Sequence, residues 1–239
     1  MRFFIVALFF TNGIYAQPND TIFIAEAIRN AVSLYGNQMT AQSRLINGSS
    51  YNRVQLLHNN RSHLEDAHPY YTFEWIPGTV LYDGEWYETS LLYDVSSDNL
   101  IMFNTTLQKQ ILLVKEKVEQ FTLNKHHFVR LNEGLPMGGG FYEVTYSGPT
   151  PVYIRTKKNM ERAVGNNATV PYKYVTKNFY YIKKGNHYYA VKSKSSVLKV
   201  LSEQRAVLKE LMRLKSFRDN RAFFISEMAR IYDHHEATK

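Results

Sequence analysis

The sequence predicts an α+β protein: a curved antiparallel β-meander, or a partly open barrel, packed by a C-terminal helix pair. The 18 tyrosines and 14 phenylalanines among 239 residues favour strands, because flat side chains pack well on a pleated surface. Short apolar runs separated by turn residues follow one another from residue 70 to residue 191, as in successive hairpins. From residue 195 the apolar residues recur at helical spacing instead.

The first sixteen residues have the three parts of a secretory signal peptide. Met1-Arg2 is a short basic start, Phe3 to Phe10 is apolar, and Ala16 offers a small residue for cleavage. The apolar run is far shorter than the roughly 18 residues that a membrane helix needs, so we expect no transmembrane segment. We therefore expect a single mature domain over residues 17–239. Residues 21–35 have apolar groups at helical spacing, which predicts a short N-terminal helix, with a strand as the competing interpretation.

The β-rich part is expected over residues 45–192, and its turns identify the hairpins. Asp83-Gly84 lies between alternating apolar runs and suits a tight type I′ turn. Residues 96–99 and 184–186 provide two further turns, and the segment 147–151 contains a glycine and two prolines. No α-helical pattern separates these strands, which argues against parallel βαβ units.

The C-terminal helices are expected over residues 195–233. Ser195 or Ser196 is the predicted N-cap of the first helix, and Asp219 that of the second. The apolar face of the first helix is predicted to contain Val197, Val200, Leu201, Val207, Leu208, Leu211 and Leu214. The buried side of the second is predicted to contain Phe223, Phe224, Met228, Ile231 and Tyr232.

Positive charge is concentrated in the last third of the chain. Residues 171–239 contain 15 basic and 6 acidic side chains, whereas residues 17–170 contain 13 and 15. We expect an anionic surface, such as lipopolysaccharide or phospholipid headgroups, to contact Lys183, Lys184, Lys192 and Lys194. Lys183 and Lys184 are expected at an exposed turn, where stability does not depend on them.

The aromatic, lysine-rich stretch 179–196 could also form a platform for single-stranded nucleic acid. Export would separate the protein from nucleic acid in the cell. Strand alternation puts Phe179 and Tyr181 on one face and Tyr180 and Ile182 on the other, so the aromatic residues are divided between two faces. Both points weigh against this partner.

The sequence contains no recognisable catalytic or metal-binding motif. It has no cysteine, which excludes disulfides and thiolate chemistry. Gly138 to Gly140 is interpreted as a connection or bulge rather than a phosphate cradle. His58, His63 and His68 recur every five residues, which aligns them on neither a helix nor a strand, although a loop could gather them.

Adjacent His126 and His127 should point to opposite faces of a strand, and His234-His235 is expected to be exposed. The carboxylate pairs Glu85/Glu88 and Asp94/Asp98 are interpreted as strand and turn acids facing solvent, with a hydrolytic pair as the alternative. We therefore assign no catalytic, cofactor-binding or metal-binding residue.

Several motifs resemble a family of uncharacterised exported proteins from Bacteroidetes-type bacteria. The similar segments are His68-Pro69-Tyr70, Tyr82-Asp83-Gly84, Leu91 to Asp94, Gly140 to Glu143 and Val191 to Ser196. The resemblance covers roughly residues 45–233 and implies export and a shared fold, with no activity to carry over. Asp20-Thr21-Ile22 is similar to the signal at which such bacteria O-glycosylate exported proteins.

We accordingly expect a soluble protein of the periplasm, the outer-membrane surface or the extracellular space. The leading hypothesis is a non-enzymatic binding or structural module whose partner is an envelope component or an anionic surface. Two alternatives stay open: a carrier of an apolar ligand between sheet and helices, and a hydrolase of unrecognised type.

Overall fold

A computed structural model describes residues 45–52, 67–162, 172–211, 217 and 220–238, together with Ile24, Ala27 and Ile28. The chain divides into two compact units, Met1–Ser43 and Arg44–Lys239. In the first unit the three described residues are helical, which agrees with the helix expected over residues 21–35. The expected signal peptide lies outside the described residues.

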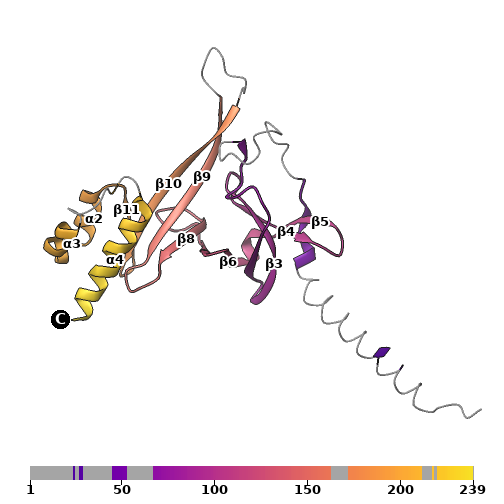
Figure 1. Ribbon diagram of the computed structural model, residues 1–239, viewed down its shortest axis with the longest axis horizontal. Coiled ribbons are helices and arrows are strands. Elements are labelled where there is room, and N and C mark those ends of the chain that lie inside the picture. Colours follow the sequence, from indigo (N-terminus) through magenta and orange to yellow (C-terminus); the bar gives the residue numbers. More distant parts are fainter. Residues whose placement is uncertain are drawn as a thin grey trace, which may run out of the picture. The chain divides into compact units, whose positions relative to one another are not determined.

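In its described residues the second unit contains an antiparallel sheet of 11 strands and three α-helices near the C-terminus, which confirms the predicted α+β class (Figure 1). The strands are β1 (Ser49–Ser50), β2 (Ile76–Tyr82), β3 (Glu85–Asp94), β4 (Asn99–Asn104), β5 (Lys109–Leu112), β6 (Val118–Leu123), β7 (His126–Leu131), β8 (Gly140–Tyr146), β9 (Val152–Arg162), β10 (Tyr172–Lys184) and β11 (His187–Val191). The helices are α2 (Lys194–Val200), α3 (Arg205–Leu211) and α4 (Arg221–Ala237), with short 3-10 turns at Leu45–Asn47, Lys115–Lys117 and Ser202–Gln204.

The sheet is open, with β1 and β11 at its two edges, and it consists of two runs of hairpins. Its order is β1-β5-β4-β3-β2-β6-β7-β8-β9-β10-β11. Strands β2 to β5 form the first run and β6 to β11 the second. After β5 the chain returns so that β6 pairs with β2, and this long-range pairing joins the two runs into one sheet.

The tight turns have the backbone geometry that their residues favour. Asp83 and Gly84 both have positive φ, 54° and 80°, as a type I′ turn requires, and Tyr82 pairs with Glu85 across it. The hairpin from β10 to β11 turns at Gly185, with φ of 57°, where a side chain would be strained. Asp98 and Asn124 occupy the same left-handed region in two further turns.

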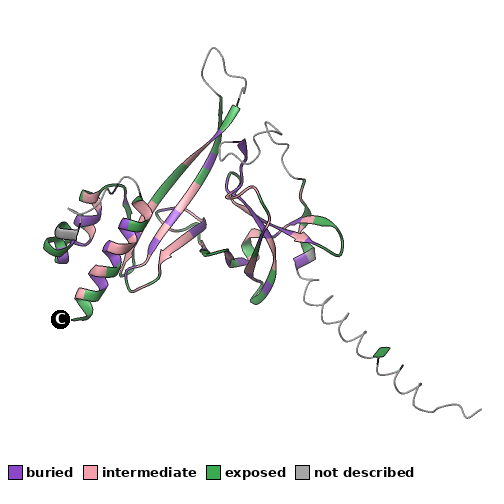
Figure 2. Cartoon of the chain, in the orientation of Figure 1, coloured by how far each residue is buried: buried purple, intermediate pink, exposed green. Residues whose placement is uncertain are grey.

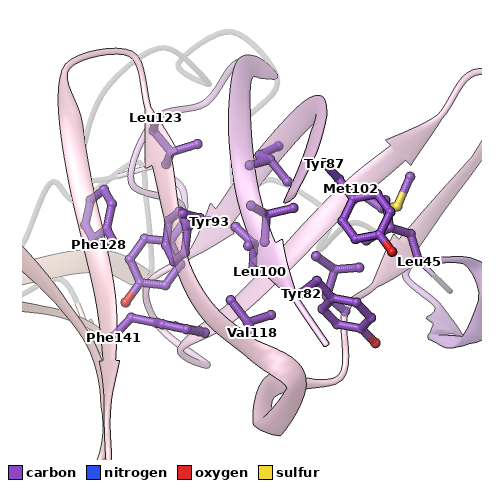
Figure 3. Close-up of a cluster of buried hydrophobic side chains, with 14 of the residues drawn as sticks. Leu45, Tyr82, Tyr87, Tyr93, Leu100, Met102, Val118, Leu123, Phe128 and Phe141 are labelled. Atoms are coloured by element: carbon purple, nitrogen blue, oxygen red, sulfur yellow. The ribbon is translucent and has the colours of Figure 1, made fainter. Parts of the chain in front are cut away.

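The first part of the sheet curls strongly, and its concave face holds the larger hydrophobic core. Tyr93 on β3 lies four strands away from Phe141 on β8, which would separate them by roughly 19 Å in a flat sheet. The two ring centroids are instead 5.8 Å apart. Figure 3 shows the side chains of this cluster converging from several strands, among them Tyr93, Phe128 and Phe141. Because the sheet is curved, side chains on one of its faces pack against one another and form a core.

The last part of the sheet is covered on one face by the C-terminal helices. Val152, Ile182 and Val191 from β9 to β11 form a second hydrophobic cluster with side chains of α2, α3 and α4. Figure 2 shows buried and exposed residues alternating along α4, as expected for a helix lying on a sheet. The helix pair that the sequence predicts is therefore confirmed as a cover for this part of the sheet.

The helices differ in detail from the prediction. Ser193, rather than Ser195 or Ser196, caps α2, and Ser196 completes a reciprocal capping box. The single helix expected from residue 195 breaks at Leu201, whose ψ of 47° is not helical. Leu201 and Leu208 are both fully buried despite the break. The spacing of apolar residues therefore looks the same as in one continuous helix and does not predict the break.

Two residues that the sequence placed on buried faces are exposed. Val207 is 38% exposed and Phe223 is 47% exposed. In both cases the next residue, Leu208 or Phe224, is buried instead. Two adjacent apolar residues cannot both face the sheet, and the sequence does not show which of them does. Asn220 caps α4 by accepting a hydrogen bond from the Phe223 amide, whereas Asp219, the predicted cap, lies outside the described residues.

Candidate binding face

The face of β9–β11 that points away from the helices carries aromatic and basic side chains in alternation. Tyr180 and Ile182 on β10 pack into the helix cluster, so Phe179 and Tyr181 must project to the other side. Directly paired residues on neighbouring strands share a face. The register pairs Tyr181 with Tyr153, Phe179 with Arg155, Lys177 with Lys157, and Lys183 with Tyr188. These eight residues define what we call the open face.

The rings and cations of the open face are in contact with one another. Lys183 Nζ lies 5.6 Å from the centre of the Tyr188 ring, and Lys157 Nζ lies 6.0 Å from that of Phe179. The rings of Tyr153 and Tyr188 are 5.8 Å apart. Such distances are typical of cation–π and tilted aromatic pairs. On the open face, cations and aromatic rings therefore alternate and contact one another.

The open face is accessible and positively charged. Phe179 is 42% exposed, and no open-face residue belongs to any hydrophobic cluster of the described chain. The same side of the two long strands also carries Lys173 and Glu161, which pair across the sheet. Five cations thus share this side with Glu161, the only carboxylate among its described residues, and Glu161 bonds Lys177 at 3.3 Å. The balance favours an anionic partner.

A hollow of about 200 Å³ lies beside the open face, between β9 and the turn from β3 to β4. Two open-face cations, Arg155 and Lys157, line it. Its other polar lining residues are Ser96, Ser97, Thr156, Asn159 and Asp98, whose carboxylate is paired with Arg155 and Lys115. Charged and neutral hydrogen-bonding groups therefore surround a space large enough for one acidic group of a ligand and the atoms next to it.

Arg155 is held in place by a polar network centred on Asp98. The guanidinium donates a 3.1 Å hydrogen bond to the Tyr142 hydroxyl, and it lies 3.7 Å from Asp98 Oδ2. Asp98 also accepts from the Tyr93 hydroxyl at 2.7 Å and pairs with Lys115 at 2.5 Å. One carboxylate thus faces two cations, so the network keeps a net positive charge.

Gly140 makes this network sterically possible. Its φ of 132° is a conformation that side chains rarely adopt, and an added Cβ would lie 2.3 Å from Asp98 Oδ2 and 2.7 Å from Arg155. The irregularity of β8 falls later, between Val144 and Tyr146. Gly138 and Gly140 therefore allow close packing around Arg155, whereas Gly139 packs against Glu133.

The four lysines predicted to contact an anionic surface occupy different environments. Lys183 belongs to the open face, and Lys192 is exposed just after β11. Lys194 is half-buried at the start of α2. Lys184 faces the helices, where its ammonium binds both carboxylate oxygens of Glu203 at 2.6 and 2.7 Å. The expectation that Lys184 is exposed is therefore wrong, because its side chain is half-buried and paired.

Electrostatics explains why Lys184 stays bound to Glu203. Burial alone would lower the pKa of Lys184, but hydrogen bonds to Glu203 and Tyr232 raise it overall. The same contact lowers the pKa of the Glu203 carboxyl. Both groups are consequently charged at neutral pH, and the pair stabilises the packing of the helices on the sheet.

Sequence reasoning missed Tyr153, Arg155, Lys157 and Tyr188 as members of one surface. Each comes from a strand other than β10, and only the pairing register brings them beside Phe179 and Tyr181. Alternation within 179–183 was the available signal, and it correctly separated the two faces. What it could not show is that helices cover one of them and leave the other open.

The carboxylates and histidines considered for catalysis or metal binding have other partners. Asp94 Oδ1 accepts from the amides of Ser96 and Ser97, which stabilises the turn. His126 bonds Glu143, and His127 bonds Gln120. Within the described ranges no three His, Asp or Glu residues are arranged to hold a metal ion. His58 and His63 lie outside the described residues.

The chain was compared with protein-family models, with curated proteins and with solved structures, and no significant match was found. Among the described helices, none has the length and apolar character to cross a membrane. The function must therefore be argued from the geometry of the molecule itself.

Proposed function

We propose that this protein is an exported, non-enzymatic binding module that binds an acidic polysaccharide of the cell envelope or its surroundings through the open face. The observation that carries the proposal is the alternation of cations with one exposed ring, Phe179, and three partly exposed tyrosine rings across three paired strands. Ring faces stack on the apolar faces of sugars, and Arg and Lys pair with carboxylate or sulfate groups.

The shape of the surface supports a polymer as the ligand. The open face runs over three neighbouring strands, and the hollow beside Arg155 and Lys157 continues it toward the turn at Ser96 and Ser97. In some small β-barrels a sheet face binds either oligosaccharides or oligonucleotides, so both ligand classes suit a surface built on strands. The expected signal peptide favours the oligosaccharide, because an exported protein meets glycans rather than the nucleic acid of the cell.

The alternative of an apolar carrier receives less support. The two described cavities, of about 420 and 200 Å³, are both lined in part by charged and polar side chains. The space between the sheet and the helices is occupied by the side chains of the second hydrophobic cluster. An apolar ligand would have to displace that packing, which is energetically costly.

A binding panel tests the proposal. Purified protein would be titrated at low and physiological salt with four probes: polygalacturonate, neutral dextran, phosphatidylglycerol vesicles and oligo-dT. We expect saturable binding of polygalacturonate that weakens as salt rises, and no binding of dextran. Preferential binding of the vesicles or of oligo-dT would overturn the polysaccharide in favour of that partner, and binding of none of the probes would overturn the proposal.

A further inference from the structure

A second cavity, of about 420 Å³, lies on the opposite face of β9 and β10, next to the helices. Its floor consists of three cross-strand pairs: Ile154 with Tyr180, Thr156 with Asn178, and Lys158 with Thr176. Successive pairs on one face are roughly 6.6 Å apart along the strands. The floor therefore changes from apolar to neutral hydrogen-bonding to cationic over a short distance.

One wall of this cleft is a hydrogen-bonded cluster of Tyr71, His126 and Glu143. His126 Nδ1 lies 2.6 Å from Glu143 Oε1 and 3.1 Å from the Tyr71 hydroxyl. At this distance Nδ1–H can donate a hydrogen bond to the carboxylate of Glu143. Burial, together with the Glu143 carboxylate, raises the pKa of Tyr71, so its hydroxyl keeps its proton. The wall thus offers both donors and acceptors.

The charged end of the floor is Lys158, which is 2% exposed. Its ammonium donates to the carbonyl oxygen of Tyr70 at 2.8 Å, a contact that fixes its position under the segment before β2. A buried ammonium acts through a low dielectric, so its field is felt strongly inside the cleft. Lys158 is the cationic group of the cleft floor and Glu143 is the anionic group of its wall, so an anionic part of a ligand is favoured at the Lys158 end.

The middle of the floor is suited to hydroxyl groups. The side chains of Thr156 and Asn178 make no hydrogen bond to the described part of the protein, and together they provide donors and acceptors opposite one another. At the other end the ring of Tyr180 and the side chain of Ile154 offer an apolar surface. Ala222, near the start of α4, has a small side chain on that border of the cleft.

We propose that this cleft binds a small sugar acid of one or two rings. The sugar ring lies over Tyr180 and Ile154, its hydroxyl groups bond Thr156 and Asn178, and its carboxylate is oriented toward Lys158. The cavity volume is at the lower end of the roughly 300–1,000 Å³ that small-molecule sites occupy. The inference does not depend on the proposed function, because the cleft and the open face lie on opposite sides of the same two strands.

Adjacent residues on β10 allow the two sites to be tested separately. Asn178 lines the cleft, whereas Phe179 belongs to the open face. We would titrate the full chain with galacturonate and digalacturonate, using galactose as the neutral counterpart, and measure binding by calorimetry and amide chemical shifts. Asn178→Ala and Thr156→Val should each weaken binding of the acids about 3–10-fold, as expected for the loss of one hydrogen bond. Phe179→Ala and Lys157→Gln should change it less than about twofold.

Three results would overturn this inference. The first is no saturable binding of either acid up to about 10 mM, well beyond the weak affinities of small ligands. The second is equal binding of galactose, which would remove the role of Lys158. The third is a loss on Phe179→Ala without a loss on Asn178→Ala, which would move the binding to the open face. Failure of polygalacturonate binding with intact digalacturonate binding would contradict only the proposed function.

Discussion

Lys184 and Glu203 form a two-pronged ion pair in which one ammonium lies 2.6 and 2.7 Å from the two carboxylate oxygens. The same ammonium donates to the carbonyl oxygen of Val200 at 3.1 Å and lies 5.2 Å from the centre of the Tyr232 ring. The end of β10 is thereby fastened to α2, to the turn that follows it and to α4. The neighbouring Lys183 points to the other face, so two consecutive lysines have separate roles.

Substitution of these two lysines should have opposite effects. Lys184→Met should lower the free energy of unfolding by about 1–2 kcal/mol, because it removes a half-exposed ion pair and a cation–π contact. Lys183→Met should change it by less than about 0.5 kcal/mol, as for most surface positions. Urea denaturation of both variants measures the difference. Equal stabilities of the two variants would refute the separation of roles.

Leu201 and Leu208 are fully buried on the helices that follow β11, whereas Val207 is exposed. Leu201→Asp and Leu208→Asp should each destabilise the protein by more than about 3 kcal/mol and cause unfolding or aggregation, because each places an unpaired charge in the second hydrophobic cluster. Val207→Asp, one residue from Leu208 but 38% exposed, should change stability by less than about 0.5 kcal/mol. Thermal melts decide the matter, and a stable Leu208→Asp protein would show that the helices do not cover the sheet.

Asp233 connects α4 to the sheet. Its Oδ2 accepts hydrogen bonds of 2.9 Å from the Tyr146 hydroxyl and from the amide of Thr150. Asp233→Ala should cost about 2–3 kcal/mol, since hydrogen bonds to a charged group are lost and the buried Thr150 amide loses its acceptor. The measurement is chemical denaturation at neutral pH. An unchanged midpoint would mean that α4 is held by apolar packing alone.

The same contact predicts sensitivity to alkaline pH. Burial and the hydrogen bond to Asp233 raise the pKa of Tyr146 to about 12 from 10.0. Because the folded-state pKa is the higher one, the stabilisation is complete below pH 10 and is lost as pH rises toward 12. Stability measured between pH 9 and 12 should therefore fall less steeply in Tyr146→Phe than in the parent protein. Parallel curves would contradict the assignment.

Gly140 should be far less tolerant of a side chain than a comparable turn glycine. Gly140→Ala forces a Cβ to within 2.3 Å of Asp98 Oδ2 at a φ of 132°, and it should cost about 1–3 kcal/mol. Gly134→Ala is the matched control, because a Cβ there meets no atom within 4 Å. The two free energies of unfolding provide the comparison, and a neutral Gly140→Ala would show that the Asp98 network adapts easily.

The sequence was sufficient for the features that depend on local chemistry. Asp83-Gly84 predicted its hairpin because few residues accept two positive φ values in succession. The period change near residue 195 predicted helices, and alternation correctly separated Phe179 from Tyr180. Each of these signals lies within a few residues of the chain.

The features that the sequence could not predict depend on contacts between distant segments. No short segment of the sequence indicates that β6 pairs with β2, or that the sheet curls and brings Tyr93 to Phe141. Lys184 was interpreted as exposed because its partner Glu203 follows 19 residues later. The residues of the open face come from three strands, and they become neighbours only through the pairing register of those strands.

The most direct test of the central claim compares matched substitutions on and off the open face. Phe179→Ala combined with Lys157→Gln would be measured against Phe223→Ala combined with Lys199→Gln. Both pairs remove one exposed aromatic ring and one exposed cation. If the open face binds an acidic polysaccharide, the first pair should weaken polygalacturonate binding at least about tenfold, equivalent to about 1.4 kcal/mol, and the second less than about twofold. Equal losses in the two variants, or no loss in the first, would contradict the claim.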